Sequence, residues 1–146
     1  MGLARWWLAI LLVAMAGGQL SDLKGFSEIL STYDVLRGPV TLPAALALSA
    51  AELTAGLGLL RGGRAAARSA PLAVAVAVAW SLLAAQAFAR GVVLANCGCF
   101  GVHLGQPLWW GVLVQDGAFV AAAVRVTRTT TAGQGGAPPR AALTSG

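Results

Sequence analysis

The segment from Pro71 to Ala89 contains no charged residue, and this run constrains the fold more than any other feature of the sequence. A helix needs about 17 to 25 residues to cross the hydrocarbon core of a bilayer. Inside hydrocarbon, only a helix satisfies its own backbone polar groups, and the runs lack the alternating pattern of β-barrel strands. Three further apolar runs cover residues 6–20, 39–60 and 108–124. The sequence therefore predicts four membrane-spanning helices, at about residues 5–21, 39–60, 71–90 and 107–125.

The composition excludes several classes of protein. Hydrophobic residues make up 58% of the chain and charged residues 10%, whereas soluble domains carry about 25% charged residues. So few charges could not cover the surface of a chain of 146 residues in water, which excludes an ordinary soluble enzyme, a disordered chain and a coiled coil. The net charge of +5 does not indicate a nucleic-acid partner, because the basic residues stand singly between apolar runs. The expected fold is all-α, an integral membrane four-helix bundle over residues 1–125 that lies in a lipid bilayer.

The distribution of Lys and Arg predicts the orientation of the helices, because cytoplasmic loops carry an excess of both. With the N-terminus in the cytoplasm, seven of the ten basic residues are cytoplasmic: Arg5, Arg61, Arg64, Arg68, Arg125, Arg128 and Arg140. The loop at residues 95–107 then faces the extracytoplasmic side of the cell membrane, and both termini are cytoplasmic. Residues 126–146 are rich in Thr, Gly, Ala and Pro without an apolar period, which predicts a disordered cytoplasmic tail.

Between the first two helices, apolar residues recur every three or four positions, at Leu23, Phe26, Leu30 and Tyr33. This spacing is typical of an amphipathic helix. We expect a short extracytoplasmic helix within residues 21–38 that lies on the outer membrane surface.

Residues 1–16 have an alternative interpretation as a cleaved leader. Arg5 precedes an apolar stretch that ends in Ala14-Met15-Ala16, as in a secretory signal peptide. The apolar run continues to Leu20, which favours a retained helix.

The two cysteines of the chain stand one residue apart, in the segment Asn96-Cys97-Gly98-Cys99-Phe100-Gly101. A disulfide joins Cα atoms about 4.4–6.8 Å apart, so a bond between Cys97 and Cys99 needs a bent backbone, which Gly98 permits. Such a small ring is strained, and strained disulfides are the more oxidising and labile ones. Disulfides persist on the predicted extracytoplasmic side. The pair is therefore expected to be an exchangeable dithiol, the catalytic centre of a thiol–disulfide oxidoreductase-like protein.

Two cations near the pair are candidate supports for a thiolate. His103 follows Cys99 closely in the sequence, which slightly favours Cys99 as the attacking thiol. Arg90 follows Gln86 by four residues, so both lie on one face of the third helix, below the loop. Each cation also has a simpler interpretation: His103 as a solvated loop residue, and Arg90 as an anchor at the membrane surface.

An alternative interpretation takes Cys97, Cys99 and His103 as soft ligands of copper(I) or zinc. The fourth ligand is missing, because the chain has no other Cys or His. The sequence otherwise predicts no metal site and no cofactor.

Glu52 and Asp116 interrupt the second and fourth apolar runs. Carboxylates within membrane helices are costly and are therefore candidate functional groups. Glu52 lies about 20 Å along its helix from Pro39, and Asp116 about 12 Å from Leu108. Neither acid is expected to touch the cysteines without a deep pocket. Two roles stay open for them, a buried hydrogen-bond partner and a proton-handling group.

The string CGCFG at residues 97–101, after a third helix that ends in Arg90-Gly91, resembles the MauE family of methylamine-utilisation membrane proteins, which belong to the DoxX-like group of four-helix membrane proteins. The resemblance covers about residues 5–124 and includes further positions: Lys24, Tyr33, Pro43, Glu52, Gly56, Leu59 and Leu60. It implies a redox-associated protein that supports disulfide formation or electron transfer during maturation of methylamine dehydrogenase, with a thioredoxin-like partner.

The sequence thus predicts a DoxX-like bundle whose extracytoplasmic loop performs thiol–disulfide exchange or electron transfer. This activity would support the maturation of a secreted oxidoreductase in a methylamine metabolic process. The expected partner is that oxidoreductase or an extracytoplasmic thioredoxin-like protein. Two alternatives stay open: a metal-handling membrane protein, and a non-catalytic membrane assembly factor with a merely structural disulfide.

Overall fold

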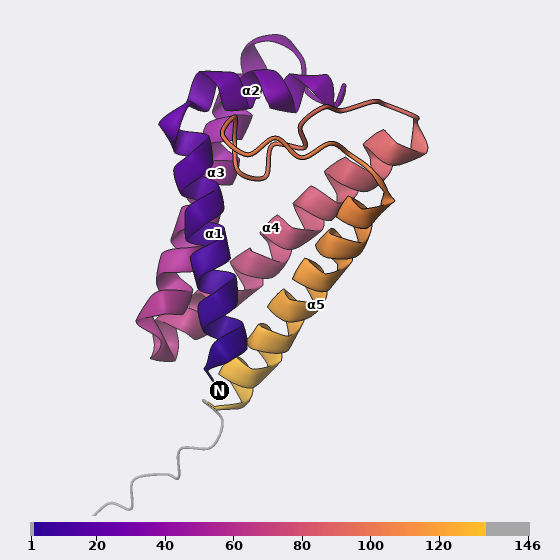
Figure 1. Ribbon diagram of the computed structural model, residues 1–146. Helices are drawn as coiled ribbons and strands as arrows, with labels where there is room; N and C mark the ends of the chain where they lie inside the picture. Colours follow the sequence, from indigo (N-terminus) through magenta and orange to yellow (C-terminus); the bar gives the residue numbers. More distant parts are fainter. Residues whose placement is uncertain (1, 134–146) are drawn as a thin grey trace, which may run out of the picture.

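The computed structural model describes residues 2–133, and Figure 1 shows that the regular structure in this range is helical. In chain order the elements are α1 (Leu3–Ser21), α2 (Leu23–Thr32), the 3-10 turn η1 (Gly38–Val40), α3 (Thr41–Arg61), α4 (Gly63–Ala89) and α5 (Trp110–Ala132). The described residues contain no strand, so the predicted all-α class is confirmed for this part of the chain.

Three segments are long and apolar enough to cross a membrane: α1, the stretch Gly38–Arg61 that includes α3, and α4. The fifth helix has sufficient length, but it carries four strongly polar residues, Gln115, Asp116, Arg125 and Arg128. The structure therefore supports a multi-pass membrane protein, with three candidate spans where the sequence predicted four.

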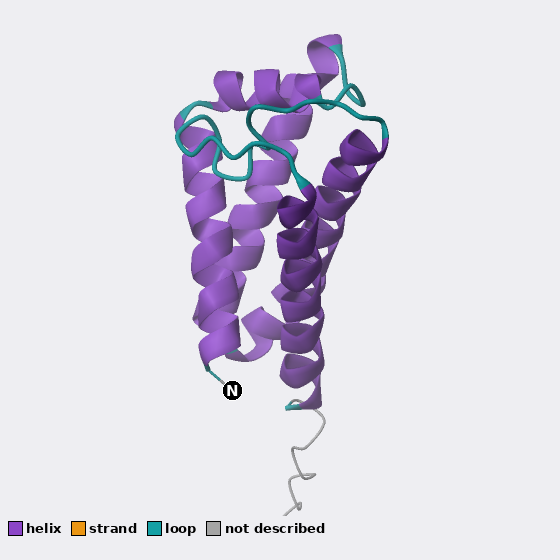
Figure 2. Cartoon of the chain, turned by 45° about the vertical axis from the view of Figure 1, so that its right-hand side comes forward, coloured by secondary structure: helices purple, strands orange, loops and turns teal. Residues whose placement is uncertain are grey.

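The four long helices run alongside one another, and α2 lies across one end of them (Figure 1 and Figure 2). α1 packs on α3, α3 on α4, and α4 on α5, whereas α1 and α5 touch only sparsely. The loop between α4 and α5 runs over the same end as α2, while the start of α1 and the end of α5 lie at the opposite end. The fold thus places α2 and the cysteine-bearing loop together.

Small residues on α3 allow its neighbours to approach closely. A Cβ atom at Gly56 would lie 2.8 Å from Val13 Cγ2 and 3.1 Å from Ala9 O, both on α1. A Cβ atom at Gly58 would overlap Ser69 of α4. These glycines set α3 between α1 and α4 at the centre of the bundle.

The predicted amphipathic helix is present as α2, although it is shorter than the segment 21–38. Asp22 caps it by accepting a hydrogen bond from the backbone N–H of Gly25 at 2.9 Å. Phe26, Leu30 and the following Tyr33 are buried against the bundle, whereas the sequence predicts a helix that lies on the outer membrane surface.

Two helix boundaries differ from the predicted ones. α4 already begins at Gly63, inside the Arg-rich segment expected as a loop, because the alanines at 65–67 are strong helix formers. Gly62, with a φ of 74°, makes the turn between α3 and α4.

α5 continues to Ala132, past the predicted end at residue 125. Its threonine hydroxyls donate to carbonyls one turn earlier, as Thr130 does to Val126 at 2.9 Å, so these polar residues are compatible with the helix. The predicted disordered tail is therefore helical over residues 126–132, and residues 134–146 lie outside the described part of the chain.

Candidate functional site: the cysteine loop

The loop between α4 and α5 is held in a hairpin-like shape by its own backbone. The backbone N–H of Cys97 donates to Gln106 O at 2.8 Å, and that of Leu108 donates to Leu94 O at 3.0 Å. These two bonds join the arm that carries the cysteines to the arm that leads into α5. These backbone bonds within the loop therefore fix the cysteines independently of its contacts with the helices.

A tight turn at residues 98–101 bends the chain at the cysteines. Gly101 N–H donates to Gly98 O at 2.9 Å, and both glycines have positive φ, 82° at Gly98 and 66° at Gly101. The side chain of Asn96 bridges the turn: its Oδ1 accepts from Gly98 N–H at 2.9 Å, and its Nδ2 donates to Gly101 O at 3.0 Å. Glycine is required at both positions, because an L side chain is strained at positive φ.

This bend places the two thiols in contact. The Sγ atoms of Cys97 and Cys99 lie 3.3 Å apart, and both thiols are free. Both residues are buried, with exposed fractions of 1% for Cys97 and 6% for Cys99. The sequence predicts an exchangeable dithiol in this loop, and the structure buries the pair under α2 and against the helices.

Polar side chains from three parts of the bundle dock this loop. Tyr33, just after α2, donates its hydroxyl to Cys97 O at 2.6 Å. Gln19 of α1 donates through Nε2 to Cys99 O at 3.0 Å, and Ser49 of α3 donates to Gln19 Oε1 at 2.7 Å. Sequence reasoning missed Gln19 and Ser49 as site residues. The available signal was a polar residue inside each of two apolar runs, since buried polar groups need partners.

The contact between the sulfurs makes the two thiols unequal. The hydrogen bond with the Cys99 thiol lowers the pKa of Cys97 to about 7, and the Cys99 backbone N–H adds to this effect. The same contact, together with burial, raises the pKa of Cys99. Burial also raises the pKa of Tyr33, so its hydroxyl stays protonated as a donor. The contact thus favours ionisation of Cys97 over ionisation of Cys99.

The two predicted cations bond to groups other than the thiols. Arg90 donates to Asp34 Oδ2 at 2.7 Å and to Gln86 Oε1 at 3.1 Å, which holds the pKa of the Asp34 carboxyl below its usual range. His103 is exposed, and its Nε2 lies 2.7 Å from Ser21 Oγ at the end of α1. The lowered pKa of Cys97 therefore arises from Cys99 and not from a contact with either cation.

The two intramembrane acids are buried in different surroundings. Glu52 is fully buried; its Oε1 accepts from Trp80 Nε1 at 2.6 Å, and its Oε2 has no partner among residues 2–133. Asp116, with an exposed fraction of 6%, lines a cavity of about 110 Å³ together with Cys99 and Trp80. Asp116 and Cys99 thus line the same cavity, whereas Glu52 is not among its lining residues.

Comparisons with known proteins show the family of this chain. A family model for the methylamine utilisation protein MauE matches residues 1–128, which include the whole cysteine loop. The chain belongs to the MauE family. A methylamine utilization protein MauE of Paracoccus denitrificans is 32% identical to it over 129 residues, which are 84% of this chain and 65% of that protein. The chain thus matches less than two thirds of that relative's length. No solved structure matches the chain.

The alternative metal site is not assembled in this MauE-family chain. Within residues 2–133, no group of three or more His, Cys, Asp or Glu side chains could hold a metal ion. The two cysteines are together, but His103 is bonded to Ser21 instead of completing a set with them.

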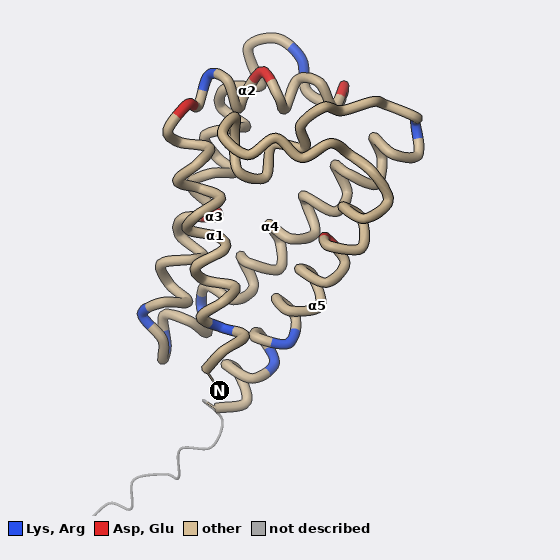
Figure 3. The backbone as a smooth tube through the Cα atoms, in the orientation of Figure 1, with Lys and Arg blue, Asp and Glu red and all other residues tan. Residues whose placement is uncertain are grey.

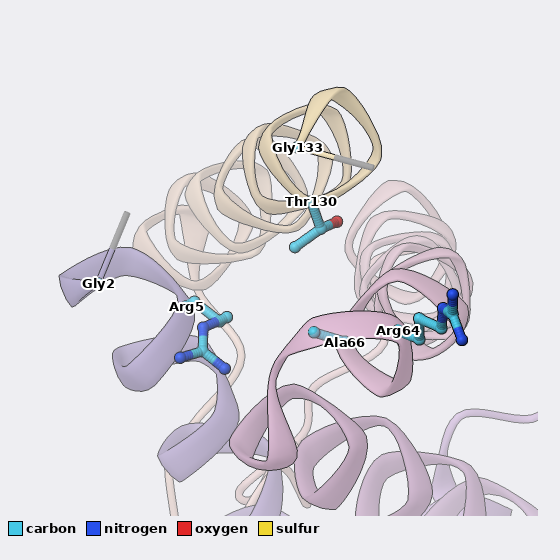
Figure 4. Close-up of a pocket in the computed structure, with 7 residues that line it drawn as sticks. Gly2, Arg5, Arg64, Ala66, Thr130 and Gly133 are labelled. Carbon is cyan, nitrogen blue, oxygen red and sulfur yellow. The ribbon is translucent and has the colours of Figure 1, made fainter. Parts of the chain in front are cut away.

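A larger cavity lies at the opposite end of the bundle and is shown in Figure 4. Its volume is about 440 Å³, and it is lined by residues of α1, α4 and α5 and their flanks: Gly2, Arg5, Gly63, Arg64, Ala66, Thr130 and Gly133. None of these side chains is a redox group or a nucleophile activated by a neighbour. Among the described residues of this MauE-family chain, the candidate redox groups therefore lie at the cysteine end.

Proposed function

We propose that this protein is a membrane redox protein whose Cys97–Cys99 pair performs thiol–disulfide exchange with an extracytoplasmic thioredoxin-like partner. The contact between the two sulfurs at 3.3 Å carries this proposal, because it pairs one thiol that ionises near pH 7 with a second that can resolve a mixed disulfide. The exchange would support maturation of a secreted oxidoreductase. Since the relative is named for methylamine utilization, the context proposed for this chain is methylamine metabolism.

The exchange proceeds in two balanced steps. The Cys97 thiolate attacks one sulfur of the partner's disulfide, which forms a mixed disulfide and releases the other partner sulfur as a thiolate. The Cys99 sulfur, after losing its proton, then attacks Cys97, which closes the Cys97–Cys99 disulfide and frees the partner's second thiolate. The reverse sequence transfers the disulfide back to the partner. Either direction requires the loop to shift from α2, because both thiols are buried.

We also propose that α5 crosses the membrane, so that both termini are cytoplasmic and the cysteine loop is extracytoplasmic. The distribution of charge in the fold supports this orientation (Figure 3). Basic residues gather at the end opposite the cysteine loop, where α1 and α4 begin and α3 and α5 end. By the helix bounds these are Arg5, Arg61, Arg64, Arg68, Arg125 and Arg128. Cytoplasmic ends of membrane helices carry such an excess. A membrane-impermeant thiol reagent applied to intact cells after reduction should modify the pair; modification only after lysis would reverse the orientation.

The burial of both thiols favours one alternative, a non-catalytic assembly factor in which the pair only stabilises the loop. Single variants separate the two functions. Cys99→Ser should trap a mixed disulfide through Cys97, because the release step needs the second thiol. Cys97→Ser is the matched control and should trap far less, since it removes the thiol that ionises near neutral pH. Non-reducing gels and mass spectrometry identify the trapped partner. Absence of a trapped partner in both variants, with folding and assembly intact, would support the structural role.

A further inference from the structure

The cavity beside Cys99 lies between α1, α4, α5 and the cysteine loop. Cys99 lines it and Cys97 does not, although the two sulfurs are in contact. Its lining includes Trp7 of α1, which is 57% exposed, and Gln115 of α5, which is also exposed. These two residues stand on the helices that touch only sparsely, so the cavity opens sideways between α1 and α5. In a bilayer, this opening faces the lipid.

The size and lining of the cavity define the shape of its ligand. An engineered cavity of about 150 Å³ in another protein binds benzene, so a volume of about 110 Å³ is close to that of one six-membered ring. Trp80, Phe100 and Phe119 offer aromatic surfaces for a flat ring. The hydrogen bond from Trp80 to Glu52 at 2.6 Å fixes the indole in its place on the cavity wall.

The polar groups of the cavity define the chemistry of the ligand. Asp116 is buried and lines the cavity, so its carboxyl group is placed to bond to an oxygen of a ligand. The adjacent dithiol yields two electrons and two protons when it forms a disulfide. A ligand that dissolves in lipid, contains one flat ring with oxygens and accepts two electrons with two protons is a quinone.

We propose that this cavity binds the ring of a membrane quinone, which accepts the electrons of the Cys97–Cys99 dithiol. The inference rests on the proposed exchange function and adds its electron acceptor. Two thiols and one quinone become one disulfide and one quinol: the S–S bond forms, both S–H bonds break, and two electrons pass to the ring. The two protons end on the two quinone oxygens, and Asp116 is placed to pass one of them to the nearer oxygen. Cys97 serves the protein partner and Cys99 serves the quinone.

This assignment gives the exchange a direction. The quinone keeps the pair oxidised, so the pair accepts electrons from the partner's dithiol and leaves a disulfide in the partner. The net reaction transfers electrons from an extracytoplasmic dithiol to the quinone pool of the membrane.

The test uses the full chain, purified in detergent, reduced and freed of reductant, with a short-chain ubiquinone analogue as the probe. We expect one quinone to be reduced for each disulfide formed. Ultraviolet absorbance measures the quinone reduced, and mass spectrometry after alkylation measures the disulfide. Leu11→Trp fills the cavity and should reduce this rate to background, while exchange of the reduced pair with an oxidised thioredoxin-like protein persists. Ile10→Trp is the matched control, because Ile10 is 59% exposed on the same helix and outside the cavity lining; it should retain both reactions.

A second measurement does not depend on the folding of a cavity variant. In Cys97→Ser, the quinol form of the probe cannot oxidise the remaining thiol and should protect Cys99 from alkylation. Equal quinone reduction by Leu11→Trp and Ile10→Trp, or no protection of Cys99, would overturn the inference. If oxidised glutathione converts the wild-type pair to a disulfide but the quinone does not, the quinone step alone is overturned. A pair that neither reagent oxidises would overturn the proposed exchange function as well.

Discussion

The two ends of the bundle are built from the same long helices but are closed in different ways. At the cysteine end, α2 and the α4–α5 loop cover the helices, and Tyr33 and Gln19 bond to the loop at 2.6 Å and 3.0 Å. At the arginine end, α3 passes into α4 through Gly62, and a cavity of about 440 Å³ lies between α1, α4 and α5. Apolar packing thus dominates the bundle, whereas a few buried polar side chains dock the loop at the closed site.

The largest expected difference between the two ends concerns a pair of glycines. Alanine at Gly98 or at Gly63 is strained, because φ is 82° and 53°, and such strain costs about 1–3 kcal/mol. At Gly98 the new Cβ would also lie 2.8 Å from Ile29 Cγ2 of α2, whereas at Gly63 it meets nothing within 4 Å. Gly98→Ala should therefore lower the melting temperature in detergent more than Gly63→Ala and expose the thiols to alkylation. Equal effects of the two variants would mean that the loop is not docked on α2.

The next effect concerns Glu52, below the cysteine loop. Glu52→Leu leaves the buried Trp80 N–H without its acceptor, which costs about 1–3 kcal/mol, while Glu52→Gln keeps an oxygen for it. The free energy of unfolding, measured by denaturant titration in micelles, should fall more for Glu52→Leu than for Glu52→Gln. If both variants stay folded and lose redox activity equally, Glu52 handles protons and its role is more than structural.

Tyr33→Phe should have a smaller effect on the same end. It removes one hydrogen bond to Cys97 O, whose net contribution is about 0.5–1.5 kcal/mol. The loop should open more often, so we expect faster alkylation of the thiols with little change in helix content by circular dichroism. An unchanged alkylation rate would show that Gln19 and the backbone bonds hold the loop without Tyr33.

The smallest effect is a shift in a titration. The pKa of Cys97 is lowered to about 7 by the Cys99 thiol, so its alkylation rate should rise with pH and reach half of its maximum near pH 7. Cys99→Ser keeps a hydrogen-bond donor beside Cys97, whereas Cys99→Ala removes it. The alkylation profile of Cys97 should therefore move to higher pH in Cys99→Ala than in Cys99→Ser. Coincident profiles would contradict the role of Cys99 in ionising Cys97.

The sequence predicts the helices well because each apolar run carries its own length and pattern. It also singles out Cys97 and Cys99, because two cysteines separated by a single glycine are a local signal of a redox pair. It does not predict their burial, which depends on Tyr33 and Gln19, residues distant in the sequence that reach the loop only after the helices pack. The cavity shared by Cys99 and Asp116 escapes prediction for the same reason, since it is a gap between helices.

The misplaced boundaries have a different origin. The charges of the segment after Arg61 report membrane topology, while its alanines favour helix irrespective of charge. The Thr-rich segment after Arg125 lacks an apolar period, yet its hydroxyls bond to carbonyls one turn earlier and are compatible with the helix. Charge and composition therefore indicate where a segment lies more reliably than whether it is helical.

A redox titration of the Cys97–Cys99 pair tests the central claim most directly. The full chain in detergent is equilibrated with mixtures of reduced and oxidised glutathione, and the fraction of disulfide is measured by alkylation and mass spectrometry. The account predicts a reversible two-electron transition, in which the ratio of disulfide to dithiol changes tenfold for about 30 mV. A pair that stays reduced under the most oxidising mixture, or that oxidises irreversibly, would contradict the claim that this loop exchanges electrons.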